Sequence, residues 1–435
     1  MIDVLLLAGG ESTRFWPFTD KNLTPFFGKP LLLWHYEQVV RIGVKNVVVV
    51  VNSDTKEKIQ SVPVPKKLTV SYIVQDGNGQ GQAVWSAGAS FENRPALILN
   101  ASDIYEDDLL KSVIETHKKD QQSILVSTVR VTSYFPGAYV KMKEDGTILE
   151  MIEKPKEGKE PSDSVTIFVY VIPHMKEFRT ALKSYAKRPL DGYERAVNKM
   201  IKNGTVAKPI LTARQWLYLK YPWHILNVMD ACLASIKGQN IDSSVKIGKF
   251  VTIEGPAIIE EGVKISEGTK IVGPIFIGRG TIVGNNNIIR QSHIGSNCVT
   301  GFATDITRSY IGDNSWFHTN YVGDSIVGQN VSMGSGTVCA NLRLDESAIT
   351  SKVKEEVIQT GRTKLGAMIG DTVRIGVNAS IMPGVKIGKG SFVGAGVVLG
   401  EDLNDGMYCR FTPTVMISQN SKKAPESRDK FKKKL

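Results

Sequence analysis

A glycine pair and two cations near the amino terminus have the types and spacing needed to bind a phosphate. Gly9 and Gly10 directly follow the apolar run 4–7, and Arg14 and Lys21 come within the next dozen positions. At the carboxyl end of a strand in a parallel sheet, backbone N–H groups without bulky side chains can approach a phosphate, and nearby cations neutralise it. A tight turn with two surface cations is the alternative interpretation of the same residues.

The neighbouring residues favour the phosphate, because the stretch resembles the signature of sugar-1-phosphate nucleotidylyltransferases. Residues 9–14 read GGESTR where the family has GGxGTR, and a lysine and then GKP (28–30) follow in the family's order. Ser12 stands at a family glycine, and Asp20 replaces the proline before the lysine. The resemblance implies that Arg14 and Lys21 stabilise departing pyrophosphate. It also implies nucleotide binding by Gly9, Gly10, Ser12 and Thr13.

Further landmarks of this family follow in order along the chain. The stretch QDGNGQGQA resembles the loop that reads the nucleobase, and LNASDIY resembles the strand whose aspartate, here Asp103, binds Mg²⁺. Capping of the next helix is the alternative role for Asp103. Phe168 replaces a family glycine, so we expect altered sugar contacts. The resemblance implies base contacts by Gln75, Gly81 and Gln82, and sugar-phosphate contacts by Gly137, Glu153, Lys154 and Thr166, the last in place of an asparagine.

The reaction implied by the resemblance is a direct displacement. An oxygen of a sugar 1-phosphate attacks the α-phosphorus of a nucleoside triphosphate, UTP or dTTP, and pyrophosphate leaves. The protein must align the groups and offset their charge. One departure concerns the metal, because relatives bring a second carboxylate from a W-x-D segment, where this chain has Tyr218. We therefore expect weaker Mg²⁺ binding and slower transfer, and a binding-only domain remains an alternative.

A second group of candidate residues lies in the stretch SWFHTNYVGDSIVGQNVSMGSGTVCANLRLDE, residues 315–346. This stretch resembles the acetyltransferase half of the bifunctional glucosamine-1-phosphate acetyltransferases. His318 matches the family's general base, which takes a proton from the sugar amine as it attacks acetyl-CoA. Relatives carry lysines at the positions of Ser347 and Thr350, and Lys352, Lys354 and Lys364 are nearby candidates to supply that charge. The resemblance further implies substrate and acetyl contacts by Tyr321 and Asn341, and acetyl-CoA contacts by Gly376 and Gly394.

Two different periodicities divide the elements that must position these residues. Strand-like and helix-like runs alternate through 1–228, which predicts an α/β domain with a mainly parallel sheet. The resemblance implies that this domain is a Rossmann-like nucleotidyltransferase domain. Aliphatic residues recur every six positions from 247 to 289 and from 369 to 399 within 240–411, which predicts a parallel β-helix. Its left hand and its assembly as a homotrimer follow from the resemblance alone. The interval 300–368 interrupts the period, and we expect a functional insertion there.

Composition sets the remaining limits on function. The chain of 435 residues carries a net charge of +11, part of it in the basic segment 418–435, which we expect to be a disordered tail. The excess suits anionic ligands, and without a nucleic-acid-binding motif we expect no nucleic-acid partner. No signal peptide or membrane span is predicted, and four cysteines without metal-ligand spacing suggest a reducing cytoplasm. A regulatory or scaffolding protein that binds nucleotide sugars is the alternative from another class.

Overall fold

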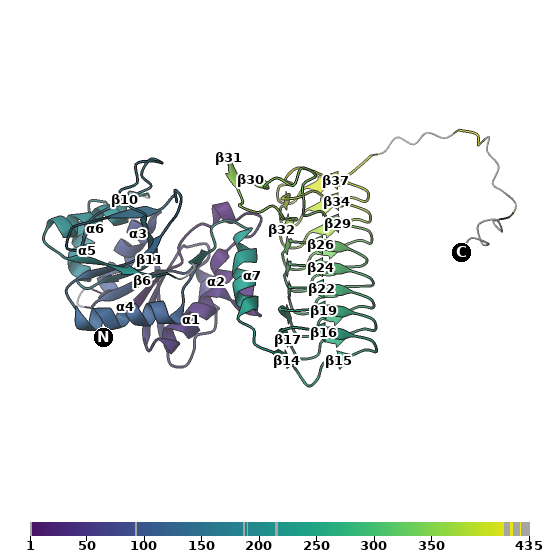
Figure 1. Cartoon of the computed structure of the whole chain (residues 1–435), viewed down its shortest axis with the longest axis horizontal. Helices are drawn as coiled ribbons and strands as arrows, with labels where there is room; N and C mark the ends of the chain where they lie inside the picture. Colours follow the sequence, from purple (N-terminus) through teal and green to yellow (C-terminus); the bar gives the residue numbers. More distant parts are fainter. Residues whose placement is uncertain are drawn as a thin grey trace.

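The computed structural model describes residues 2–91, 94–185, 188, 190–213, 216–412, 418–420 and 427. Most of the predicted basic tail, 418–435, therefore lies outside the described residues. Two bodies lie side by side, an α/β layered body and a stack of short strands, with helix α7 (His224–Ala234) between them (Figure 1).

A nine-stranded sheet forms the centre of the first body. Its order is β10-β9-β11-β6-β1-β4-β5, with β8 beside β11 and β12 beside β8. The strands β1, β4, β5 and β6 are parallel as predicted, whereas β11 runs antiparallel to β6, β8 and β9. The strand bounds are β1 Asp3–Leu7, β4 Asn46–Val51, β5 Thr69–Val74, β6 Ala96–Asn100, β8 Ile124–Arg130, β9 Ala138–Met142, β10 Ile148–Glu153, β11 Ser164–Ile172 and β12 Ala207–Leu211.

Helices cover both faces of this sheet, because two separate apolar clusters lie against it. One cluster packs α3, α5 and α6 against one face, and the other packs α1 and α4 against the opposite face. The central strands β1, β4, β6 and β11 are buried on both faces, as their near-continuous apolar runs predict, whereas no residue of the edge strand β5 is buried. The helix bounds are α1 Leu31–Arg41, α2 Lys56–Gln60, α3 Gln80–Ala87, α4 Asp107–Lys119, α5 Met175–Leu182 and α6 Gly192–Lys202.

The second body is a parallel β-helix whose coils present three faces. The covered face, which packs against the α/β body, consists of β14 Gln239–Ile241, β17 Ala257–Ile259, β20 Ile275–Ile277, β23 His293–Ile294, β25 Tyr310–Ile311, β27 Ile326–Val327, β32 Met368–Ile369 and β35 Lys386–Ile387. The second face consists of β16 Thr252–Glu254, β19 Lys270–Val272, β22 Ile288–Arg290, β24 Asp305–Thr307, β26 Tyr321–Gly323, β29 Val338–Cys339, β34 Ser380–Ile381 and β37 Val398–Leu399.

The third face holds β15 Lys246–Ile247, β18 Lys264–Ile265, β21 Ile282–Val283, β28 Ser332–Met333, β33 Arg374–Ile375, β36 Phe392–Val393 and β38 Tyr408–Cys409. Isolated bridges from Ile282 through Val299 and Trp316 to Ser332 join its two strand groups. The six-residue series fills the interior of the coils, and Ile265, Ile271 and Ile381 are fully buried there. The prediction of a parallel β-helix is confirmed.

The predicted interruption at 300–368 is wrong for its first part, because the coils continue to residue 340. On the second face Lys270 pairs with Ile288, 18 positions on, whereas Asp305 pairs with Tyr321, only 16 positions on. A coil of three six-residue sides keeps the period, and coils that are one or two residues shorter lose it without leaving the helix. The actual departure lies between paired Val338 and Ser380, which are 42 positions apart.

This excursion, residues 342–366, carries a hairpin toward the α/β body (Figure 1). The hairpin consists of β30 Thr350–Val353 and β31 Glu356–Gln359, which pair antiparallel. Its apolar residues Val353 and Ile358 pack into a mixed cluster with Phe15 and Trp223 of the α/β body. An interdomain core therefore holds the two bodies and the hairpin together.

The cysteines are present as thiols. All four cysteines are free, and burial raises the pKa of the Cys298 and Cys339 thiols to about 12. Among the described residues, no helix combines the length and the apolar character needed to cross a bilayer.

Candidate functional site

A long cleft opens at the carboxyl ends of the parallel strands, where open α/β sheets bind ligands. Its first part is a cavity of about 530 Å³ bounded by the turn after β1 and by the start of α3. Its second part, about 210 Å³, lies beside Asp103 and shares Lys21, Asn100 and Lys220 with the first. The structure thereby brings these residues together in one cleft: Gly9, Gly10, Ser12, Thr13, Arg14, Lys21, Gln75, Asp103, Gly137, Glu153 and Thr166.

The two glycines after β1 have different roles in the cleft wall. A Cβ atom at Gly9 would lie 2.4 Å from Gln75 Oε1, so only glycine leaves room for this side chain. Gln75 follows β5, and its Nε2 donates to the Gly77 carbonyl at 2.6 Å. A Cβ at Gly10 would meet nothing within 4 Å and would project into open space. Gly9 therefore seats Gln75, and Gly10 leaves the backbone open to a ligand.

The backbone conformation at Ser12 is one that favours glycine, the residue that the family pattern has at this position. Its backbone is left-handed, with φ of 54°, a conformation that glycine adopts without strain. Its Oγ is buried and has no hydrogen-bond partner among the described residues. A buried hydroxyl without a partner is costly, so this donor points to a ligand that accepts its hydrogen bond.

Three cations converge on the same cavity. Arg14 lies in the short 3₁₀ helix η1 (Thr13–Phe15), Lys21 begins η2 (Lys21–Leu23), and Lys220 follows β13 (Leu217–Tyr218). Burial lowers the pKa of Lys21 and of Lys220, and the Arg14 guanidinium lowers both further. Like charges held this close destabilise one another until an anion arrives, which is the electrostatic character of a polyphosphate site.

Asp103 lies in the short strand β7 (Asp103–Ile104) and is buried at the centre of the cleft. Burial raises its pKa to about 6, while Lys21 and the Trp216 N–H favour the charged form. Trp216 Nε1 donates to Asp103 Oδ2 at 3.2 Å, and β13 pairs Tyr218 directly with Asp103. Tyr218 thus occupies the place predicted for a second carboxylate, and burial raises its pKa further above neutrality.

The second part of the cleft has a bulkier wall than the family pattern implies, because Phe168 stands where the pattern has a glycine. The Phe168 ring is in its wall and packs 5.0 Å from Tyr170 and 5.2 Å from Tyr193, measured between ring centroids. Thr166 and Gly137 border the same space. A Cβ at Gly137 would lie 2.8 Å from the Phe135 ring, so this position has no room for a side chain.

Glu194 is a site residue that the sequence analysis missed. It lies in the first turn of α6, and it borders the sugar end of the cleft together with Glu153. Burial, reinforced by the Glu153 charge, raises the pKa of Glu194 to about 8, and its Oε2 has no hydrogen-bond partner among the described residues. A protonated carboxyl is a donor for a sugar hydroxyl. A lone glutamate in an amphipathic helix carries no motif that would identify it.

Glu194→Gln is expected to stabilise the protein at pH 8 by about 2 to 4 kcal/mol and to have little effect at pH 5. The folded pKa of about 8 lies above the unfolded value near 4.5. Between these values the unfolded state releases a proton that the folded state retains, so stability falls as pH rises through this window. Glutamine does not titrate, so the variant does not lose stability in this way. Chemical denaturation at both pH values measures the free energy of unfolding, with exposed Glu144→Gln as control. The same change in unfolding free energy at pH 5 and pH 8 would contradict the prediction.

Three predicted site residues lie outside the cleft wall as the described residues define it. Gly81 packs against α6, where a Cβ would lie 3.3 Å from the Tyr193 backbone nitrogen. Gln82 is buried beneath the loop at Gly77. Lys154 Nζ pairs with Glu153 Oε1 at 3.3 Å. Lys220, and not Lys154, borders the sugar end of the cleft together with Glu153. Asn78, Gly79 and Gln80 border the cleft in place of Gly81 and Gln82.

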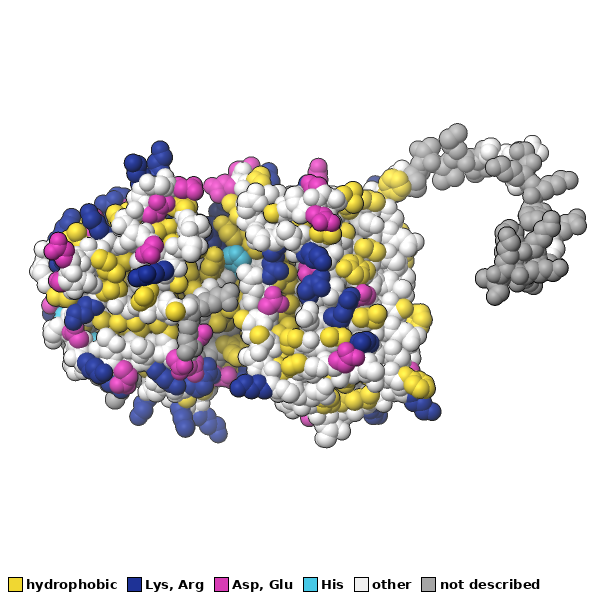
Figure 2. All heavy atoms as spheres, viewed as in Figure 1, with side chains coloured by type: hydrophobic (Ala, Val, Ile, Leu, Met, Phe, Trp, Pro, Cys, Tyr) yellow, Lys and Arg dark blue, Asp and Glu magenta, His cyan; other side chains and the backbone are white. Residues whose placement is uncertain are grey.

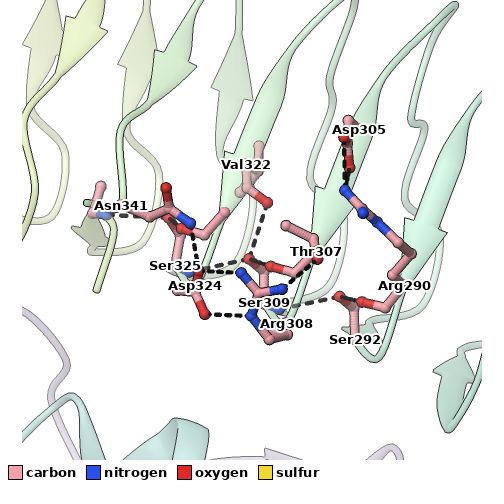
Figure 3. Close-up of polar contacts among 12 residues, drawn as sticks. Arg290, Ser292, Asp305, Thr307, Arg308, Ser309, Val322, Asp324, Ser325 and Asn341 are labelled. Atoms are coloured by element: carbon pink, nitrogen blue, oxygen red, sulfur yellow. Dashed lines mark hydrogen bonds and ion pairs between the residues drawn. The ribbon is translucent and has the colours of Figure 1, made fainter. Parts of the chain in front are cut away.

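The second candidate site lies where the second face of the β-helix turns toward the covered face (Figure 3). Arg308 binds Asp324 through two hydrogen bonds of 2.7 Å, and the Asn341 amide also donates to Asp324. A Cβ at Gly323 would lie 2.6 Å from both Asn341 Nδ2 and the Tyr321 hydroxyl. The Tyr321 and Asn341 side chains therefore converge over Gly323, and the Arg308–Asp324 pair holds Asn341 in place.

His318 lies at the preceding corner, between the third and second faces, and its side chain is exposed. Thr319, its neighbour, accepts from the Gly336 N–H at 2.8 Å, and each later coil stacks on this corner. Gly376 and Gly394 lie at the same corner, and their N–H groups donate to Val393 and Cys409 at 2.7 Å. The corner thus aligns His318, Gly376 and Gly394 along one edge of the β-helix.

The lysines near this site have separate locations. Lys364 pairs with Leu342, which directly follows Asn341, so it is the candidate nearest to this site. Ser347 donates to Asp345 at 2.9 Å on the exposed excursion. Thr350 begins the hairpin, and Lys354 borders the nucleotide cleft.

Comparison with known proteins agrees with this division. The profile of the family described as Nucleotidyl transferase matches residues 3–218, and that of Bacterial transferase hexapeptide (six repeats) matches residues 366–401. Together they support the predicted fold class, an α/β Rossmann-like nucleotidyltransferase domain followed by a left-handed parallel β-helix.

Whole-chain relatives cover both bodies. A Sulfurisphaera tokodaii protein named "Bifunctional sugar-1-phosphate nucleotidylyltransferase/acetyltransferase" is 32% identical, over 93% of this chain and 98% of the relative. A Methanococcus aeolicus protein named "Bifunctional protein GlmU" is 31% identical, over 97% of this chain and 100% of the relative. A crystal structure of UDP-glucose pyrophosphorylase complexed with UDP-glucose has 22% identity and a TM-score of 0.41, and covers 48% of this chain and 91% of that one.

Proposed function

This chain belongs to the family of bifunctional sugar-1-phosphate nucleotidylyltransferase/acetyltransferase enzymes, and from that premise we propose that its two bodies catalyse successive steps toward one nucleotide sugar. The β-helix acetylates glucosamine 1-phosphate with acetyl-CoA. The α/β body then joins the N-acetylglucosamine 1-phosphate to a nucleotide from UTP or dTTP. The observation that carries this proposal is the cleft in which Arg14, Lys21 and Lys220 converge beside buried Asp103.

Each part of the cleft has a proposed role in nucleotidyl transfer. The triphosphate lies over Gly10 and accepts from Ser12 Oγ, while Arg14 and Lys21 offset the charge that develops on pyrophosphate. The base lies beside Gln75. Lys220 holds the phosphate of the sugar 1-phosphate, whose oxygen attacks the α-phosphorus in line with the leaving group. Glu153 and protonated Glu194 bind sugar hydroxyls at the far end of the cleft.

The residues present fit Mg²⁺ that arrives with the triphosphate. Among the described residues, no group of three or more His, Cys, Asp or Glu side chains could hold a metal alone. Mg²⁺ is commonly bound by one or two carboxylates and by substrate phosphates, so Asp103 supplies one ligand and the nucleotide supplies others. When bound, the ion neutralises phosphate charge.

Tyr218→Asp is expected to lower the Mg²⁺ concentration for half-maximal nucleotidyl transfer about tenfold. The substitution places a second carboxylate beside Asp103 across the β7–β13 pair. Titration of Mg²⁺ in an assay of pyrophosphate release measures the change. Tyr218→Asn removes the same ring contacts with Trp216 and His224 without adding charge, so it is the matched control. The same half-maximal concentration in both variants would contradict the assignment.

In the β-helix, the proposal assigns the general base to His318. Its exposed imidazole can take the proton from the sugar amine as nitrogen attacks the thioester carbon, and CoA thiolate leaves. Tyr321 and Asn341 orient the sugar phosphate and the acetyl group, and Lys364 offsets phosphate charge. Gly376 and Gly394 lie at the corner along which the proposal places the extended CoA molecule, and a Cβ at Gly376 would lie 2.5 Å from the Ala395 backbone nitrogen, so glycine lets the coils stack there.

The proposal also includes a homotrimer formed through the β-helix, and a cytoplasmic location. Large apolar side chains are exposed on the third face, away from the covered one; these are Ile282, Trp316, Phe392 and Tyr408. Figure 2 shows apolar side chains on the exposed surface of the β-helix body. Such residues favour contact with further copies of the chain. The four free cysteines suit a reducing compartment.

A matrix of nucleoside triphosphates against sugar 1-phosphates, with Mg²⁺ and mass-spectrometric detection, tests the proposed nucleotidyl transfer. UTP or dTTP with N-acetylglucosamine 1-phosphate is expected to give the nucleotide sugar and pyrophosphate. A free-thiol assay with acetyl-CoA and glucosamine 1-phosphate tests acetyl transfer. The names of the relatives favour turnover over binding alone. Binding without product in both assays would favour a regulatory protein instead.

A further inference from the structure

The hairpin β30–β31 leaves the β-helix and ends at the nucleotide cleft of the other body. Its turn consists of Lys354 and Glu355, since Val353 and Glu356 form the last pair. Lys354 borders the same cavity as Gly10, Arg14 and Lys220. It is a fourth cation at this cavity, and it comes from the body that carries the other candidate site.

The strands of the hairpin are fixed by contacts with both bodies. Val353 and Ile358 pack into the interdomain core with Phe15, the residue next to Arg14. Lys386 Nζ, buried in the β-helix, donates to Ser351 Oγ at 3.0 Å and to the Lys352 carbonyl, and it lies 5.4 Å from the centroid of the Trp16 ring. The hairpin is therefore packed against η1, which carries Arg14.

The turn also faces the end of η1 that would meet the leaving group. Thr13 borders both the nucleotide cavity and an open hollow of about 820 Å³ beside the hairpin, and Lys354 borders both as well. Asp103 and the sugar end lie on the opposite side, in the part of the cleft that Lys354 does not border. The exposed Lys354 ammonium lies at the same cavity as Thr13 and Arg14, so it adds positive charge to a site where three cations already favour an anionic ligand.

We propose that Lys354 binds the β- or γ-phosphate of the nucleoside triphosphate, so that the β-helix body completes the pyrophosphate site of the α/β body within one chain. This inference rests on the proposed nucleotidyl transfer. It assigns Lys354 to leaving-group stabilisation and removes it from the candidates for the acetyltransferase site. It also makes the excursion 342–366 a functional contact between the two bodies.

Lys354→Asn in the full chain tests this assignment. Asparagine removes the charge and tolerates the left-handed backbone of this position, where φ is 56°. We expect kcat/KM for the nucleotide to fall roughly 10- to 100-fold and KM for pyrophosphate in the reverse reaction to rise similarly, since charge-assisted phosphate contacts are this strong. KM for the sugar 1-phosphate and the rate of acetyl transfer should remain within about twofold. Lys354→Arg should retain most activity.

Lys249→Asn is the matched control, because the same change is made on an exposed lysine of the β-helix body that borders neither part of the nucleotide cleft. Equal nucleotide kinetics for Lys354→Asn and the wild type would overturn the proposal, as would a selective loss of acetyl transfer. Calorimetry with inorganic pyrophosphate and Mg²⁺ separates this outcome from failure of the proposed function. Suppose that the wild type shows no turnover but binds pyrophosphate, and that Lys354→Asn binds it more weakly. The proposed nucleotidyl transfer is then wrong, and the contact between Lys354 and phosphate stands. Equal pyrophosphate affinity in both proteins would overturn the contact.

Discussion

Asp103→Asn is expected to lower nucleotidyl transfer by about 10³-fold while acetyl transfer stays within about twofold. Asn keeps the shape of the buried side chain but removes the negative charge that the structure places between Lys21 and the Trp216 N–H. Because Tyr218 supplies no second carboxylate, the Mg²⁺ site proposed above depends on this single charge. Loss of one preorganised electrostatic group typically costs 10²- to 10³-fold, and the absence of a second carboxylate places the effect at the upper end.

Pyrophosphate release at saturating Mg²⁺ measures this effect, and circular dichroism with the retained acetyl transfer shows that the chain is folded. The capping role considered for Asp103 is wrong, because the N-cap of α4 is Glu106 and Asp103 lies in β7. A purely structural role for Asp103 would still change stability and leave the rate per folded molecule unchanged. Nucleotidyl transfer within tenfold of the wild type would show that the carboxylate is not part of the reacting site.

His318→Ala has the second largest expected effect, a 10²- to 10⁴-fold loss of acetyl transfer, the usual contribution of a positioned general base. The exposed imidazole adds little to packing, because the hydrogen bonds of His318 with the coil are made by its backbone, whose carbonyl accepts from Thr304 and whose N–H donates to Asn320 Oδ1. The β-helix should therefore remain folded. Nucleotidyl transfer from N-acetylglucosamine 1-phosphate should be unchanged, since the cleft lies in the other body.

Release of free CoA thiol measures the His318→Ala effect, and added imidazole distinguishes a base from a residue that only orients substrate. Free imidazole should restore part of the rate of the variant, because it can take the proton in place of the missing side chain. Exposed Thr319→Ala, at the next position of the same corner, is the matched control. A variant that retains the wild-type rate would exclude His318 as the base.

Local patterns allowed much of the fold to be predicted. The alternation of strand-like and helix-like runs through 1–228 correctly indicated the layered α/β body, because runs such as those that form α4 and β4 each match the period of one element. The six-residue series marked the interior of the β-helix for the same reason. The coils between 300 and 340 were misread, since a coil shortened by one or two residues loses the period while its strands still pair.

The candidate sites were predictable where a motif is contiguous and not where the fold assembles them. Gly9, Arg14 and Asp103 belong to short stretches, and the structure brings them to one cleft. Glu194, Lys220 and Lys354 come from three distant elements, and their roles depend on how α6, β13 and the hairpin dock. The position of Lys354 depends on the burial of Val353 and Ile358 in the interdomain core, which no local pattern specifies.

One incubation tests the central claim most directly, namely that a single chain acetylates a sugar phosphate and then joins it to a nucleotide. The full chain receives glucosamine 1-phosphate, acetyl-CoA, UTP and Mg²⁺, and free CoA, pyrophosphate and nucleotide sugar are followed together by mass spectrometry. We predict that CoA appears first, that pyrophosphate and an acetylated nucleotide sugar follow in equal amounts, and that omitting acetyl-CoA prevents the acetylated product. Persistence of intact UTP with any of the substrates, while the protein is folded, would contradict the account.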